Sequence, residues 1–130
     1  MSHATDSSQA PPKAGPYSHA VRTGNIVFLS GQGPFHPETG EIAEAFDEQV
    51  RQTLRNLASA AESAGGSLAD AVRVGVYLQD MANFPVLNEV YPEFFQEPYP
   101  ARTTVQSGIR IQVEIDAVLE LAQPASSSRS

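Results

Sequence analysis

FDEQVRQTLRNLASAAESAGGSLADAVRVGVYLQ, residues 46–79, changes its hydrophobic period halfway along its length. Between Phe46 and Ala64 the apolar residues recur every three or four positions, which predicts an amphipathic helix. Gly65-Gly66 is expected to end this helix as a C-cap. Residues 71–79 then place apolar residues at every second position, which is typical of a strand. The fold therefore combines helix and strand.

Further patterns on both sides of this stretch complete the expected elements. Two strands, 17–24 and 25–31, meet at the turn-forming pair Gly24-Asn25. HPETG, 36–40, has the composition of a turn, and a short strand is expected at 41–43. A second helix should begin at Asp80 or Asn83, tolerate Pro85 in its first turn, and kink or stop at Pro92. The last expected strands are 101–106 and 110–121.

The final strand indicates how the layers pack. Five apolar residues alternate along it and should face the helices: Val113, Ile115, Ala117, Leu119 and Leu121. Glu114 and Asp116 point the other way, and on the earlier strand Ile26 and Phe28 share a face with Ser30. The order of elements gives an α+β fold with two helices on one face of a sheet, and we expect oligomerisation through the helix-free face.

Composition limits the organisation to one domain. The chain has 130 residues, of which 41% are hydrophobic, so one core is expected over residues 13–122. Residues 1–12 and 123–130 are rich in Ser, Pro and polar residues and are expected to be disordered tails. No apolar run reaches the ~18 residues of a membrane span, and cysteine is absent, so we expect a cytoplasmic protein that does not contact membranes. The net charge of −7, with scattered basic residues, argues against a nucleic-acid partner.

Arg102 is the strongest candidate for ligand binding. It follows the segment EPYPA, 97–101, and opens a β-branched run in a chain with only 8 basic residues. A guanidinium can bind a carboxylate through two parallel hydrogen bonds, which suits an anionic substrate. The alternative is a structural salt bridge to Glu114 or Asp116 on an adjacent strand.

Other polar residues offer weaker signals. Glu114 and Asp116 share a strand face, where mutual repulsion would raise the pKa of one carboxyl and make it a proton carrier. Ser30 and Tyr17 offer hydroxyls and Asn88 an amide, although each also fits a structural hydrogen-bonding role. The three histidines have no metal-ligand spacing, and SGQGP lacks the length of a phosphate-binding loop, so no metal or nucleotide cofactor is expected.

Several segments in order resemble the reactive intermediate deaminase family, also called the Rid or YjgF family. They are GPYSHAV, NIVFLSGQGPFHPETGEI, VYLQDMANFPVLNEVYPEFF, PYPARTTV and VEIDAV, and together they span about residues 15–122. The resemblance implies a chorismate-mutase-like fold, a homotrimer with a central β-barrel, and active sites between subunits. It also implies cofactor-independent hydrolysis of small carboxylated 2-enamines or 2-imino acids, such as 2-aminoacrylate and 2-iminopropanoate, to 2-keto acids and ammonia.

The resemblance assigns a role to individual residues. Arg102 matches the arginine that binds the substrate carboxylate, Glu114 the acidic residue that positions water, and Tyr17 the tyrosine near the cleft. Substrate-binding positions match Ser30, Gly31, Asn88 and Thr104, the last of which is a cysteine in several relatives.

The segment between Arg102 and Glu114 is about three residues shorter here than in many relatives, and we expect this shorter hairpin to affect substrate choice. Two alternatives therefore stay open. The same scaffold would suit a larger carboxylated enamine, as in a 2-aminomuconate-type deaminase or a tautomerase, or a non-catalytic ligand-binding or regulatory protein.

Overall fold

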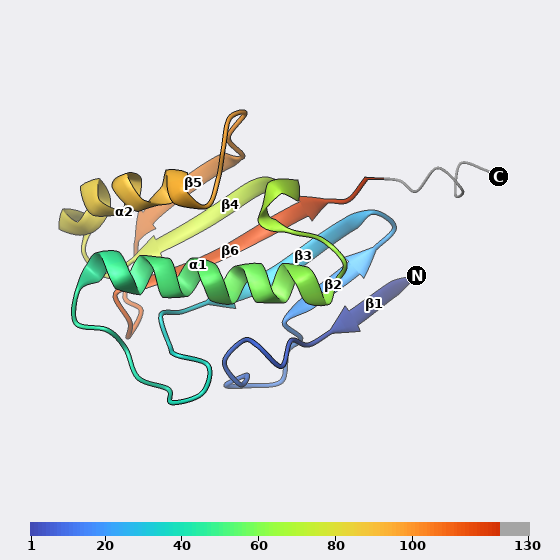
Figure 1. Cartoon of the computed structure of the whole chain (residues 1–130), viewed down its shortest axis with the longest axis horizontal. Coiled ribbons are helices and arrows are strands. Elements are labelled where there is room, and N and C mark those ends of the chain that lie inside the picture. The colour runs from blue at the N-terminus through green and yellow to red at the C-terminus, as the bar shows by residue number, and fades with distance from the viewer. Residues whose placement is uncertain (123–130) are drawn as a thin grey trace.

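Residues 1–122 are described by the computed structural model, and they form a six-stranded sheet with two helices (Figure 1). The strands are β1 (Ser2–Thr5), β2 (Ala20–Thr23), β3 (Ile26–Gln32), β4 (Ala71–Leu78), β5 (Ala101–Gln106) and β6 (Val113–Glu120). The helices are α1 (Phe46–Ser63) and α2 (Phe84–Val90), with 3-10 turns at Leu68–Asp70, Met81–Asn83 and Tyr91–Glu93. The strand order is β1-β2-β3-β6-β4-β5, with only β4 and β5 parallel to each other. The expected α+β fold is confirmed.

Both helices cover the same face of this sheet, and α1 crosses its middle above β3 and β6 (Figure 1). The alternation in β6 is as expected, because its odd-numbered apolar residues are buried beneath the helices with Leu54 and Leu57 of α1. α1 ends as predicted at the double glycine. Gly65 has a φ of 85°, a left-handed conformation that glycine adopts without strain, and the N–H of Gly66 bonds back to the Ala61 carbonyl.

The region around α2 confirms the effects expected of its prolines. Pro85 lies in the first turn of α2, and the helix ends at Val90, two residues before Pro92, which lies in a 3-10 turn. Asp80 caps the preceding 3-10 turn, since its side chain accepts a hydrogen bond from the Ala82 N–H. These turns bring α2 over the parallel pair of β4 and β5, where Arg102 lies.

Three local expectations are wrong. Residues 1–12 are not a disordered tail in this structure, because β1 pairs along β2, from Ser2 opposite Thr23 to Thr5 opposite Ala20. Residues 41–43 form no strand, although the turn before them is present. Val72 belongs to the alternating apolar residues of 71–79, but it does not reach the core and is 45% exposed, because the pairing of β4 with β6 shifts register at this point. The expected tail over 123–130 lies outside the described residues.

The segment after β5 also differs from expectation. β6 begins at Val113 rather than at residue 110, and residues 107–112 are not a hairpin. β4 lies between β5 and β6 in the sheet, so this segment passes the end of β4 to connect them. The Ser107 N–H bonds to the Leu78 carbonyl and the Gln79 N–H to the Gln112 carbonyl, which fixes both ends of the connection against β4. A shorter segment here therefore changes a crossover between non-adjacent strands.

Candidate active site

Arg102 lies at the edge of the sheet, on the side of the helices. Its parallel pairing partner on β4 is Val74, whose side chain is buried beneath the helices, so Arg102 points to the same face. Its Nη2 donates a 2.8 Å hydrogen bond to the Asn88 Oδ1 on α2. The guanidinium carbon also lies 4.7 Å from the centre of the Tyr91 ring and 5.6 Å from that of Phe84.

These partners hold the Arg102 guanidinium without neutralising it. Within residues 1–122, no carboxylate lies within ion-pair distance of Arg102. The alternative of a salt bridge to Glu114 or Asp116 is therefore wrong for the single chain, because β4 separates β5 from β6. Arg102 opens into what we call the arginine cavity, a space of about 340 Å³ lined by Asn88, Tyr91, Pro92, Tyr99, Pro100 and Arg102. A fixed, uncompensated cation in such a cavity is suited to binding an anion.

Glu114 lies in a second cavity, which we call the glutamate cavity. It has a volume of about 420 Å³ and is lined by Pro11, Pro12, Ala14, Tyr17, His19, Ser30, Gly31, Gln32, Gly33, Phe35, Ile111 and Glu114. The Glu114 carboxylate lies directly over Gly31, where a Cβ atom would collide with its Oε2. The structure therefore brings together three predicted site residues, Tyr17, Ser30 and Gly31, around the predicted proton carrier.

The electrostatics of β6 distinguish its two carboxylates. Burial, and secondly the negative charge of Asp116, raise the pKa of Glu114 above its usual value. Asp116 itself accepts a 3.1 Å hydrogen bond from the Tyr77 hydroxyl, and its charge raises the pKa of Tyr77. Since Asp116 has this partner and lines neither cavity, Glu114 is the better candidate for proton transfer.

Of the remaining predicted residues, Ser30 and Tyr17 line the glutamate cavity, Asn88 lines the arginine cavity, and Thr104 lines neither. The Ser30 hydroxyl donates to the Ser18 carbonyl and the Tyr17 hydroxyl accepts from the Ala14 N–H at 3.3 Å, so both hydroxyls are held in place beside Glu114. Thr104 lies two residues after Arg102 on the helix-facing side of β5. Its Oγ1 is buried and has no hydrogen-bond partner among the described residues.

The two cavities lie on opposite sides of the sheet. Glu114 pairs with Tyr77, on the helix-free face, whereas Arg102 pairs with Val74, on the helix-covered face. One ligand therefore cannot touch both side chains within one chain. If both act on the same ligand, the site must be completed by a second chain.

Several residues of these cavities were not predicted. Tyr91 lies one helical turn after Asn88, a spacing that points to the same target, so the sequence contained a signal for it. The glutamate cavity also forms where segments far apart in the sequence meet, and this contact brings in Ile111, Pro11 and Pro12. No local sequence pattern indicated these three residues.

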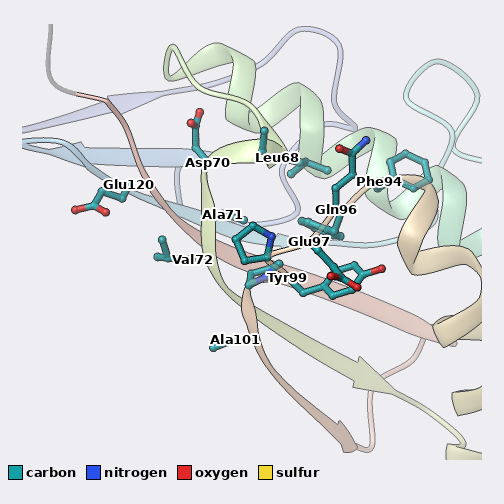
Figure 2. A pocket seen from close by; sticks show the side chains of 14 residues that line it. Leu68, Asp70, Ala71, Val72, Phe94, Gln96, Glu97, Tyr99, Ala101 and Glu120 are labelled. Carbon is teal, nitrogen blue, oxygen red and sulfur yellow. The ribbon is translucent and has the colours of Figure 1, made fainter.

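A further cavity lies elsewhere, between the start of β4 and the loop that leads into β5 (Figure 2). Its volume is about 670 Å³, and its charged lining residues are Asp70, Glu97 and Glu120. Three carboxylates and no basic residue would repel an anionic substrate, so this cavity is not the counterpart of the arginine cavity.

No group of three or more possible metal ligands occurs in residues 1–122. Over the same range, no helix is both long enough and apolar enough to span a membrane.

The chain is thus an α+β domain with an arginine on one sheet face that has no ion-pair partner within residues 1–122, and a glutamate of raised pKa on the other face. The comparisons with known proteins give its family. A family profile described as "Endoribonuclease L-PSP" matches residues 7–121, and the chain belongs to this family, which includes the YjgF, RutC and Rid proteins. The expected resemblance is confirmed.

The relatives in this family have informative names. A RutC family protein of Pyrococcus horikoshii is 44% identical over 113 residues, which are 84% of this chain and 90% of the relative. A protein of Dermatophagoides farinae named 2-iminobutanoate/2-iminopropanoate deaminase is 36% identical over 117 residues, covering 85% and 91%. Among solved structures, RidA from an Antarctic Psychrobacter matches with a TM-score of 0.88 and 43% identity, covering 92% of this chain and 99% of that one.

Proposed function

We propose that the protein hydrolyses reactive 2-imino acids, and their 2-enamine tautomers, to 2-keto acids and ammonia. The observation that carries this proposal is the pair of cavities, one with an uncompensated arginine and the other with a glutamate whose pKa is raised. A carboxylate next to a C=N group needs a fixed cation for binding and a proton carrier for hydrolysis, and the two cavities offer one of each. The name of the Dermatophagoides relative supports the same substrate class.

In the proposed reaction Arg102 binds the substrate carboxylate, with Asn88 and Tyr91 holding the guanidinium in position. Glu114 takes a proton from water as the water oxygen attacks C2 of the imine, and it passes that proton to the nitrogen. It then takes the proton of the new C2 hydroxyl and passes it to the nitrogen as the C2–N bond breaks. Ammonia leaves, C2 becomes a carbonyl, and Glu114 returns to its starting state.

The proposed site lies between two chains of a homotrimer, whose sheets form a central barrel through their helix-free faces. Two observations support this arrangement. Arg102 and Glu114 cannot meet within one chain, and the helix-free face exposes apolar side chains that a partner would cover. Phe28 is 51% exposed and Val105 is 41% exposed on this face.

The proposal is tested by competition between the protein and semicarbazide for a freshly formed imine. An amino-acid oxidase generates 2-iminopropanoate from alanine, and the formation of the semicarbazone is followed spectroscopically. Wild type should suppress semicarbazone formation, whereas Arg102→Ala should lose at least about 10²-fold in kcat/KM, since charge-assisted hydrogen bonds to the carboxylate are removed. Full activity of a correctly assembled Arg102→Ala variant would show that binding of the substrate carboxylate by Arg102 is not part of the mechanism.

A further inference from the structure

A buried histidine holds the N-terminal loop, residues 6–14, in place. His19 is only 4% exposed and contacts this loop through both ring nitrogens. Its Nδ1 accepts a 2.9 Å hydrogen bond from the Ser7 N–H, so the ring hydrogen is on Nε2. Nε2 then donates to the Pro11 carbonyl at 3.0 Å. One imidazole therefore bridges two points of the loop that are four residues apart.

The backbone of His19 adds further links. Its N–H donates to the Asp6 Oδ1 at 3.0 Å, and the Asp6 Oδ2 accepts from the Lys13 Nζ at 2.7 Å. Its carbonyl accepts a 3.0 Å hydrogen bond from the N–H of Ser30, which lies in the glutamate cavity. The loop is thus connected through His19 to the strand residue beside Glu114.

The other side of the loop forms a wall of the glutamate cavity. Pro11, Pro12 and Ala14 line this cavity together with the apolar side chains of Phe35 and Ile111. These five residues offer no side-chain hydrogen-bonding group, so they suit contact with an apolar substituent. Because Pro11 is also the residue whose carbonyl His19 holds, the position of the wall depends directly on His19.

We propose that His19 is a positioning residue, which fixes the loop of residues 6–14 as a wall of the glutamate cavity and thereby limits the size of the substrate side chain. The inference rests on the proposed deaminase function and names its substrate class: 2-imino acids with short apolar side chains. Imines with large aromatic side chains are excluded while the loop is held, and they gain access when it is released.

Two pairs of matched variants test this inference. His19→Leu keeps a buried side chain of similar size but removes both hydrogen bonds, whereas the amide of His19→Gln can accept from Ser7 and donate to Pro11. Ser7→Pro removes the donor from the loop without changing the core, and Ser7→Ala is its control. The second pair keeps the test valid if His19→Leu does not fold.

Two measurements are made on each variant. The first is the rate of trypsin cleavage after Lys13, identified by mass spectrometry, which reports release of the loop without any reference to activity. The second is the ratio of kcat/KM for the imine of phenylalanine to that for 2-iminopropanoate. We expect His19→Leu and Ser7→Pro to raise both the cleavage rate and this ratio by about fivefold or more, as for the loss of a buried hydrogen bond. His19→Gln and Ser7→Ala should behave like wild type.

Each outcome has a distinct meaning. Unchanged cleavage in both His19→Leu and Ser7→Pro would overturn the positioning role of His19. Faster cleavage with an unchanged substrate ratio would overturn the size limit. If wild type is inactive on every imine, the deaminase function and the size limit fail together, and the cleavage rates still decide whether His19 holds the loop.

Discussion

Arg102 and Glu114 lie on opposite faces of one sheet, with β4 between their strands. The protein therefore separates the two groups that the proposed reaction needs at one substrate. Under the proposed mechanism a single chain would carry half of one site and half of another, so activity would require assembly.

Glu114→Gln should lower kcat by about 10²-fold. This loss is at the low end of the range usual for removal of a general base, because imine hydrolysis is already fast in water. The same variant should be at least as stable as wild type at neutral pH. A raised pKa in the folded state means that ionisation of Glu114 opposes folding. The contribution of the protonated carboxyl to the free energy of unfolding is therefore lost as the pH rises through the folded-state pKa. Steady-state rates and thermal unfolding at pH 5 and pH 8 check both expectations. If Glu114→Gln is less stable than wild type at pH 8, the raised pKa of Glu114 is contradicted.

Asp116→Asn should shift the acid limb of the activity profile to lower pH. The charge of Asp116 is one cause of the raised pKa of Glu114, so its removal lowers that pKa and keeps the base ionised in more acidic solution. The Tyr77 hydroxyl, which donates to Asp116, can still donate to the asparagine oxygen in this variant. A pH profile of kcat/KM between pH 4 and pH 8 measures the shift. An acid limb at unchanged pH would show that Asp116 does not act on the essential base.

Gly31→Ala should reduce activity by about tenfold or more without unfolding the protein. Gly31 does not have a positive φ, so alanine is compatible with its backbone, but the new Cβ would push against the Glu114 carboxylate. Gly108→Ala is the matched control, since a Cβ there meets no atom within 4 Å. Circular dichroism and imine competition should separate the two variants. Equal activities would mean that the position of Glu114 over Gly31 has no functional importance.

Phe28→Glu should prevent assembly and leave a folded monomer. In the single chain the Phe28 side chain is half exposed on the helix-free face. In the proposed trimer this face is an interface, where burying the glutamate charge would cost free energy. Met81→Glu, which alters an exposed side chain on the 3-10 turn before α2, should not affect assembly. Analytical ultracentrifugation should give three times the 13.9 kDa chain mass for wild type and the control, and the chain mass itself for Phe28→Glu. A wild-type protein that sediments as a monomer would refute the trimer.

The sequence predicted those features that depend on local periodicity. The apolar spacing of α1, the alternation in β6 and the double glycine at residues 65 and 66 identify both elements and the faces that they bury. Arg102 could be selected because a basic residue is unusual in that setting.

The features that were missed depend on pairing between distant segments. The polar sequence of β1 has no strand pattern of its own, and it becomes a strand by hydrogen bonding to β2. The face on which Arg102 lies follows from its parallel pairing with β4, and β4 also separates it from Glu114. Periodicity carries no information on either point, so the salt-bridge alternative could only be rejected once the strand order was known.

In the proposed homotrimer each site combines Arg102 of one chain with Glu114 of another, and a complementation experiment tests this arrangement. Arg102→Ala and Glu114→Gln are each purified in inactive form and then unfolded and refolded together in equal amounts. Random trimers that contain both variants have one interface with both residues intact, so up to about a quarter of wild-type activity should return. Refolding each variant alone is the control and should restore nothing. If the mixed trimers form and remain as inactive as the two parents, the shared site between chains is contradicted.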